Sequence, residues 1–96
     1  MPSLEETRKK INTIDEQLVP LFLERMECSV EVAKVKKEQG LPVLNQARED
    51  EILQRLTMGL SEEDAAAVKD LYIKIFEISR NRQSRFLDTS CVGSEK

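Results

Sequence analysis

The sequence has 96 residues, a length that suits one domain with a small hydrophobic core. Charged residues make up 34% of it and glycine and proline occur three times each, a composition that favours helices over strands. The formal net charge of −3 argues against a general nucleic-acid-binding or acidic-membrane-binding surface, although a local basic pocket is compatible with it.

The sequence lacks features that membrane-spanning, secreted and metal-binding proteins carry. No apolar run is long enough to span a bilayer and no signal peptide is recognisable, so we expect a cytoplasmic protein. Histidine and Cys-x-x-Cys pairs are absent, which argues against a zinc site and removes the commonest general base. We predict no metal site and no cofactor. Cys28 and Cys91 lie far apart, and we expect both thiols to be reduced.

The first forty residues carry a heptad-like pattern that predicts one long helix. Ser3 with Glu6 forms a capping box at its start, and Gly40 followed by Pro42 marks its end. Pro20 removes one backbone hydrogen bond and should bend the helix, but the pattern keeps its phase across it. Two series of residues spaced by seven form this heptad seam: Leu4, Ile11, Leu18, Arg25 and Val32, and Thr7, Ile14, Leu21, Cys28 and Val35.

The predicted helix is too long for one compact domain of this size. At the usual rise per residue it would extend roughly 55 Å. A helix of this length needs a partner to cover it, and a second copy of the chain is the simplest partner. The sequence therefore predicts a homodimer.

Two further helices follow. The second runs from about Gln46 to Met58, with Asn45 as its N-cap and with an apolar face formed by Ile52, Leu53 and Leu56. The third opens at Ser61 with acidic residues in its first turn, and its apolar stripe contains Val68, Leu71, Tyr72, Ile75 and Phe76. We predict one all-α, three-helix domain over residues 1–88, followed by a flexible C-terminal tail over residues 89–96.

Two cationic side chains lie on one face of the long predicted helix. Arg25 occupies a seam position, and a buried arginine without an anion costs several kcal/mol. Lys36 follows 11 residues later, almost three turns, so both point the same way to within about 20°. Taken alone, Arg25 is more often a register-setting residue or part of an internal salt bridge, and Lys36 is more often a solvated lysine.

The other two helices also place polar residues on apolar faces. Ser79 and Gln83 stand where the stripe of the third helix predicts apolar side chains, and their spacing of four puts them on one face. Glu49 lies beside the apolar face of the second helix, directly after Arg48. Taken singly these are weak signals, because serine and glutamine are often exposed and a charged run such as 48–51 is usually a solvated face.

Arg8 lies 17 residues before Arg25, which is roughly 25 Å along the same helix. It therefore cannot reach a small ligand held beside Arg25 of its own chain. An antiparallel dimer would bring the partner's Arg8 to that ligand. One assumption then explains both the long helix and the distant arginine.

Together these residues resemble the all-helical, type II chorismate mutases over nearly the whole chain, about residues 4–87. The segments that carry the resemblance are RKKINTID (8–15), LFLERMECSVEVAKVK (21–36), PVLNQAREDEIL (42–53) and ISRNRQ (78–83). The resemblance implies a three-helix protomer in an intertwined homodimer, with two active sites built from both chains. The implied reaction is the pericyclic rearrangement of chorismate to prephenate, a step toward phenylalanine and tyrosine that needs no nucleophile, metal or proton transfer.

The resemblance also implies a role for each matching residue. Arg25 and the partner's Arg8 would bind the two substrate carboxylates. Lys36 and Gln83 would donate hydrogen bonds to the ether oxygen whose bond breaks, and Glu49 would accept one from the substrate hydroxyl. The catalytic residues would be Arg25, Lys36, Glu49 and Gln83. Arg48 and Ser79 would support the site, and Asn45 stands where the family often has an acidic residue, so the implied substrate-binding set is Arg8, Arg25, Lys36, Asn45, Arg48, Glu49, Ser79 and Gln83.

Three other functions are compatible with parts of this pattern. An isochorismate pyruvate-lyase would share the scaffold and the arginine and lysine positions, but Glu49 and Ser79 favour the mutase. A non-catalytic helical adaptor or ligand-binding module would explain the seam without explaining polar residues that converge from three helices. An RNA-binding helical hairpin would need an exposed basic face, and acidic residues outnumber basic ones here.

Overall fold

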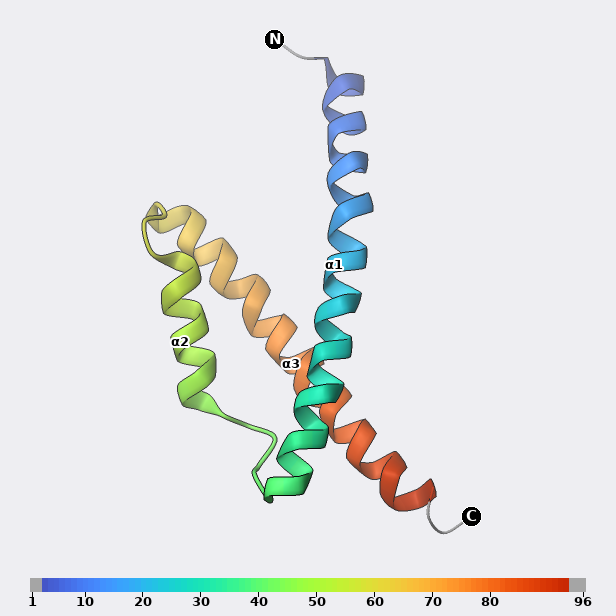
Figure 1. Cartoon of the computed structure of the whole chain (residues 1–96). Coiled ribbons are helices and arrows are strands. Elements are labelled where there is room, and N and C mark those ends of the chain that lie inside the picture. The colour runs from blue at the N-terminus through green and yellow to red at the C-terminus, as the bar shows by residue number, and fades with distance from the viewer. Residues whose placement is uncertain (1–2, 94–96) are drawn as a thin grey trace.

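The computed structural model describes residues 3–93, with side chains described as far as Asp88, and this range forms three α-helices without strands. α1 spans Leu4–Gln39, α2 spans Gln46–Thr57 and α3 spans Glu62–Gly93. Two long helices, α1 and α3, cross each other, and the short α2 lies beside the first half of α3 (Figure 1). The all-α class and the three-helix order predicted from the sequence are confirmed.

The ends of α1 lie where the sequence signals placed them. The Ser3 hydroxyl accepts a hydrogen bond of 3.1 Å from the backbone N–H of Glu6, and the helix continues through Pro20. Gly40 ends it with a φ of +68°, a conformation that glycine adopts without a steric cost. The backbone N–H groups of Gly40 and Leu41 bond back to carbonyls of the last turn, as in a Schellman ending.

The other two helices also begin with the predicted caps. The Asn45 side-chain oxygen accepts from the backbone N–H of Arg48 at 3.1 Å, and the Ser61 hydroxyl accepts from that of Asp64 at 3.1 Å. These bonds satisfy backbone donors that have no partner inside the helix. α2 ends at Thr57, within one residue of the predicted end.

The C-terminal region is helical further than the sequence suggested. α3 continues to Gly93, so residues 89–93 of the predicted flexible tail are part of the helix, whereas residues 94–96 lie outside the described residues. The boundary at residue 88 remains a prediction. Cys28 is an exposed free thiol, and the side chain of Cys91 lies outside the described ones.

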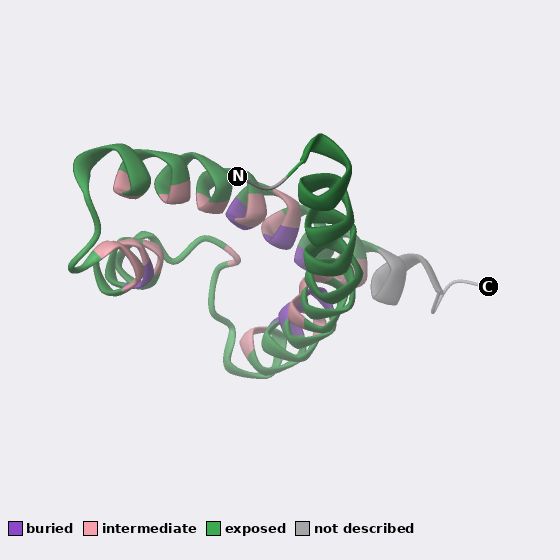
Figure 2. Ribbon diagram, turned by 90° about the horizontal axis from the view of Figure 1, so that it is seen from above, coloured by how far each residue is buried: buried purple, intermediate pink, exposed green. Residues whose placement is uncertain are grey.

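The buried residues lie on the second half of α1, on α2 and on the faces of α3 that these helices contact (Figure 2). Met26 and Ala33 have no exposed surface, and Leu71, which was expected on the apolar stripe of α3, is 53% exposed. Only a few described residues are buried: the apolar Met26, Ala33, Ile52 and Phe76, and the polar Ser29, Ser79 and Gln83. The core of one chain is therefore small and partly polar.

The first half of α1 has no such packing. It projects beyond α2 and α3 (Figure 1), and every residue from 3 to 21 is exposed. Its seam residues Leu4, Ile11, Ile14, Leu18 and Leu21 are 48–66% exposed. The heptad seam is thus left uncovered by the single chain. Within the described residues, no helix is long and apolar enough to cross a membrane.

Candidate active site

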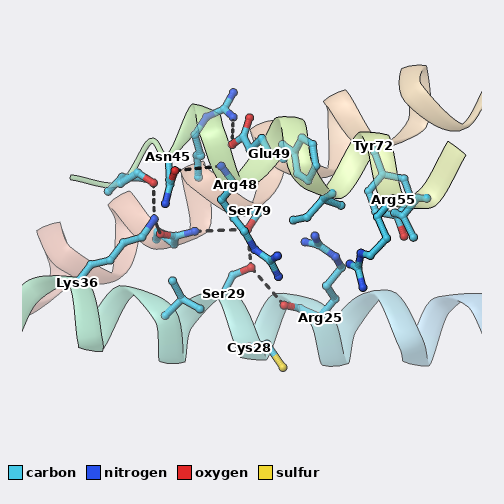
Figure 3. Close-up of a pocket in the computed structure, with 17 residues that line it drawn as sticks. Arg25, Cys28, Ser29, Lys36, Asn45, Arg48, Glu49, Arg55, Tyr72 and Ser79 are labelled. Carbon is cyan, nitrogen blue, oxygen red and sulfur yellow. Dashed lines mark hydrogen bonds and ion pairs between the residues drawn. The ribbon is translucent and has the colours of Figure 1, made fainter. Parts of the chain in front are cut away.

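A pocket of about 610 Å³ lies between the second half of α1, α2 and α3 (Figure 3). That volume is typical of sites for small molecules. The pocket is lined by five cationic side chains, whereas Glu49 is the one carboxylate among its described lining residues. The five cations are Arg25, Lys36, Arg48, Arg55 and Arg80. A chain with a net charge of −3 therefore concentrates positive charge at one cavity, which suits an anionic ligand.

Seven of the eight residues predicted to bind the substrate line this pocket. They come from the three helices and from the N-cap of α2: Arg25, Lys36, Asn45, Arg48, Glu49, Ser79 and Gln83. The eighth, Arg8, does not line it and lies on the exposed first half of α1. The fold therefore brings together the residues of the three helices and leaves Arg8 apart within one chain.

Arg25 is held by aromatic rings instead of by a carboxylate. Its guanidinium carbon lies 5.6 Å from the ring centroid of Tyr72 and 5.8 Å from that of Phe76, within the range of cation–π attraction. The two rings meet edge to face, with centroids 5.9 Å apart. No ion pair joins Arg25 to a carboxylate of the described residues. Its positive charge is thus positioned by packing and can pair with an anionic ligand.

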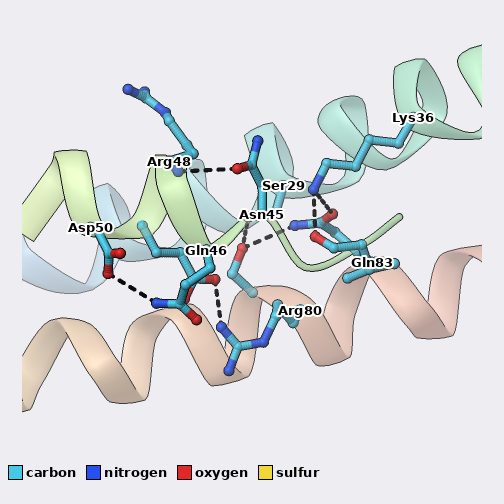
Figure 4. Close-up of polar contacts among 11 residues, drawn as sticks. Ser29, Lys36, Asn45, Gln46, Arg48, Asp50, Arg80 and Gln83 are labelled. Carbon is cyan, nitrogen blue, oxygen red and sulfur yellow. Dashed lines mark hydrogen bonds and ion pairs between the residues drawn. The ribbon is translucent and has the colours of Figure 1, made fainter. Parts of the chain in front are cut away.

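Lys36 lies at the end of the pocket away from Arg25 (Figure 3), and there it meets Gln83 (Figure 4). The Lys36 ammonium donates to the backbone carbonyl of Val43 at 2.5 Å and to the side-chain carbonyl of Gln83 at 3.3 Å. Burial lowers the pKa of Lys36, and the attraction of Glu49 partly opposes that shift. The contact turns the oxygen of the Gln83 amide toward the lysine.

Glu49 is fixed by an arginine on the neighbouring helix. Arg80 of α3 donates to the Glu49 carboxylate at 2.5 Å, and the Glu49 side chain is only 16% exposed. A carboxylate so enclosed is held in one orientation and keeps its remaining acceptor capacity for other donors. Glu49 is therefore a positioned hydrogen-bond acceptor inside a largely cationic pocket.

Asn45 and Arg48 are placed differently from the other predicted residues. The side-chain oxygen of Asn45 caps α2, so it already has a backbone partner. The Arg48 guanidinium forms an exposed ion pair of 2.9 Å with Glu51 and points away from the Lys36–Gln83 contact (Figure 4). Their roles in ligand binding remain predictions. In the structure Asn45 caps the start of α2 and Arg48 pairs with Glu51 of the same helix.

Several residues that line the pocket were not assigned to the site from the sequence, among them Ser29, Arg55, Tyr72 and Arg80. Ser29 had a signal, since it lies four residues after Arg25 and seven before Lys36, on the same helical face. Tyr72 was assigned to the apolar stripe, which hid its contact with Arg25. Arg80 had no local signal, because its partner Glu49 lies 31 residues away.

Comparison with known proteins agrees with this arrangement. Residues 7–84 match the family described as chorismate mutase type II. The chain is 35% identical to the chorismate mutase of Methanocaldococcus jannaschii over 75 residues, which cover 78% of this chain and 74% of that protein. It is 39% identical to the bifunctional chorismate mutase/prephenate dehydratase of Escherichia coli K12 over 82 residues, which cover 83% of this chain but 21% of that protein.

Two further similarities concern a longer protein and a solved structure. The chain is 31% identical to the T-protein of Haemophilus influenzae over 88 residues, which cover 90% of this chain but only 23% of that protein. A conserved hypothetical protein from Pyrococcus furiosus has a similar solved structure, with a TM-score of 0.71 and 32% identity over 86% of this chain and 97% of that one. The fold, the pocket and these matches together show that the chain belongs to the type II chorismate mutase family.

Proposed function

We propose that this chain catalyses the rearrangement of chorismate to prephenate, in the biosynthesis of phenylalanine and tyrosine. The observation that carries the proposal is a cavity of about 610 Å³ lined by five cations and a single described carboxylate. Chorismate is a small dianion with one ring hydroxyl and one ether oxygen. The cations match its carboxylates, and Glu49 supplies the acceptor for its hydroxyl.

The proposed role of Arg25 is to hold one substrate carboxylate. Two aromatic rings fix its guanidinium, and its charge has no carboxylate partner in the described residues. A guanidinium can bind a carboxylate through two parallel hydrogen bonds, which fixes orientation as well as position. Holding both carboxylates of a flexible substrate favours the compact, chair-like shape in which the rearrangement occurs.

The second carboxylate is assigned to Arg8 of the partner subunit. Arg8 lies 17 residues before Arg25 on α1, roughly 25 Å away, so it does not reach the pocket of its own chain. The exposed seam around it supports an intertwined homodimer, because its five apolar seam residues from Leu4 to Leu21 are about half or more exposed in one chain. Covering that seam with a second antiparallel copy would bring one Arg8 to each pocket.

Lys36 and Gln83 are the proposed donors to the ether oxygen. This oxygen gains negative charge as its bond to carbon breaks, and donors already in place stabilise that charge without reorganising. The Lys36 ammonium donates to the Gln83 amide oxygen at 3.3 Å, which holds the two side chains next to each other, and Gln83 is buried. Glu49 accepts from the substrate hydroxyl. No proton transfer is needed, which fits a chain without histidine.

The activity test follows chorismate loss by ultraviolet absorbance with the purified protein. The product is identified by acid conversion to phenylpyruvate. Saturable turnover to prephenate is expected, and Arg25→Ala protein, checked for folding by circular dichroism, serves as the matched control for contaminating activity. A folded protein that leaves chorismate unchanged and converts isochorismate to salicylate and pyruvate would instead be a lyase. A folded protein inert toward both compounds would contradict an enzymatic function.

A further inference from the structure

A continuous line of polar side chains runs through the core between α1 and α3. Ser29, Ser79 and Gln83 are 5%, 7% and 6% exposed, and they are the buried polar residues among the described ones. Gln83 and Ser79 belong to the predicted site, whereas Ser29 has no role in the proposed mechanism. Polar groups are costly to bury unless they are hydrogen-bonded, so the presence of Ser29 at this point of a small core calls for a reason.

The directions of the hydrogen bonds along this line follow from counting protons. A serine hydroxyl has one proton to donate. The Ser29 hydroxyl donates to the backbone carbonyl of Arg25 at 3.2 Å, so its proton is already in use. The two hydroxyl oxygens of Ser29 and Ser79 are 2.5 Å apart, and Ser79 must therefore be the donor in that contact (Figure 3).

The same reasoning extends to the glutamine. With its proton given to Ser29, the Ser79 oxygen can only accept, and its available donor is the Gln83 amide nitrogen at 3.5 Å. The Gln83 carbonyl oxygen then accepts from Lys36 at 3.3 Å (Figure 4). Each end of the amide thus has a partner of the matching kind. The second N–H of the Gln83 amide takes no part in these hydrogen bonds and can donate to a ligand.

We propose that Ser29 is a positioning residue that fixes the orientation of the Gln83 amide through Ser79. The inference rests on the proposed function, since the amide matters as the donor to the ether oxygen. Without the Ser29 hydroxyl, the Ser79 proton loses its acceptor, and a Gln83 amide turned by 180° would offer Ser79 its oxygen in place of its nitrogen. A turned amide would satisfy Ser79 but would place its NH₂ group against the Lys36 ammonium. The Gln83 amide then populates two orientations, and in only one of them does its free N–H point at the substrate.

The test compares Ser29→Ala with Ser29→Thr and with a matched control on the same helix, Thr13→Ala. The Thr13 hydroxyl makes the same kind of bond, to the backbone carbonyl four residues earlier at 3.2 Å, but it is exposed and touches neither Ser79 nor Gln83. Ser29→Ala should lower kcat/KM roughly threefold to tenfold, mainly through kcat. Ser29→Thr, which keeps the hydroxyl, should retain most of the activity, and Thr13→Ala should match the wild type.

A pH profile separates orientation from simple packing. In a Gln83→Glu background, the introduced carboxylate blocks activity when ionised and permits it when protonated. Adding Ser29→Ala frees the Ser79 proton to bond the ionised carboxylate, which lowers its pKa and moves the acid recovery of activity to lower pH. A packing defect would lower activity at every pH without moving the profile. An unmoved profile, or equal activity in the Ser29→Ala protein and the wild type, would overturn the proposal.

A second readout does not depend on turnover. Proton–nitrogen NMR of the Gln83 side-chain amide, assigned by its disappearance in Gln83→Glu, should show one protected NH₂ pair in the wild type. Ser29→Ala should broaden or shift that pair and speed its hydrogen exchange, whereas Thr13→Ala should leave it unchanged. If the wild type shows no chorismate turnover, the proposed function fails, and this NMR comparison still decides whether Ser29 orients the amide.

Discussion

The two halves of α1 differ in their surroundings although one heptad pattern runs through both. From residue 3 to 21 every position is exposed, and Leu18 keeps 53% of its surface. A few residues later Met26 is fully buried, and Arg25, Ser29 and Lys36 line the pocket. The second half of the helix lines the candidate site, whereas the first half leaves an apolar seam and Arg8 exposed. The comparison shows that the residues lining the pocket come from the second half of α1, and that Arg8 and the exposed seam belong to the first half.

The largest effect is expected where the two halves contribute to one site. Arg25→Ala and Arg8→Ala should each lower kcat/KM roughly 100-fold or more, because each removes a charged anchor from a desolvated carboxylate. Mixing the two inactive proteins under conditions that exchange subunits should restore about one quarter of the wild-type activity. Half of the dimers are then mixed, and one of the two sites in each carries both arginines.

The control for this mixing experiment is either variant alone, taken through the same exchange procedure. Subunit exchange is measured independently with fluorescent labels on the two proteins. Complete exchange without recovered activity would show that Arg8 of one chain and Arg25 of the other do not serve one shared site.

The next effect concerns the seam itself. Ile14→Asp places a charge in the middle of the exposed seam, where Ile14 is 53% exposed in one chain. In the proposed homodimer this charge would be buried in both copies, which should weaken the association of the two chains by roughly 100-fold and lower activity with it. Thr13→Asp adds the same charge at the neighbouring exposed position off the seam and should leave the dimer intact. Sedimentation velocity with parallel activity assays makes the comparison.

A dimer that is unaffected by Ile14→Asp would show that this seam is not the contact between copies. Equal dissociation by both substitutions would point to a general effect of charge on α1. In either case the exposed first half of the helix would need another explanation.

A smaller effect on activity is expected at Gln83, in the pocket that the second half of α1 lines. Gln83 is 6% exposed and bonds to Lys36 of α1. Gln83→Glu should lower activity roughly tenfold or more near neutral pH, because an ionised carboxylate repels the charge that develops on the ether oxygen. Activity should return in acid as the carboxylate gains a proton and becomes a donor. Steady-state rates across the pH range, beside a wild-type profile, test this, and a flat profile would place Gln83 away from that oxygen.

The sequence predicted the features whose causes are local. Helix caps depend on residues three or four positions apart, so Ser3, Asn45 and Ser61 could be recognised and were confirmed. Polar residues on apolar faces pointed to the pocket for the same reason, since a helix sets their spacing. The Arg80–Glu49 and Ser29–Ser79 contacts join residues 31 and 50 positions apart. Those contacts depend on how the helices cross, which periodicity within each helix does not determine.

The smallest expected effect concerns the charge of Lys36 at the end of α1. Burial lowers the pKa of Lys36 from its ordinary value of 10.5, and Glu49 opposes this across the pocket. Glu49→Gln keeps the shape of the side chain and removes its charge, so the pKa of Lys36 should fall further. Glu51→Gln is the control, because Glu51 is exposed on the same helix and pairs with Arg48. Titration of the Lys36 side-chain carbon signal by NMR should detect the first shift and show none for the control.

The sign of the accompanying stability change follows from proton linkage. A lysine whose pKa is lower in the folded chain binds its proton more tightly when unfolded, so the free energy of unfolding rises with pH between the folded and unfolded pKa values. Glu49→Gln should make that rise begin at lower pH in thermal unfolding, while Glu51→Gln should follow the wild type. If Glu49→Gln left the Lys36 titration unchanged, the carboxylate of α2 would not act on the end of α1. Burial of Lys36 between α1 and the rest of the pocket would then be the sole cause of its lowered pKa.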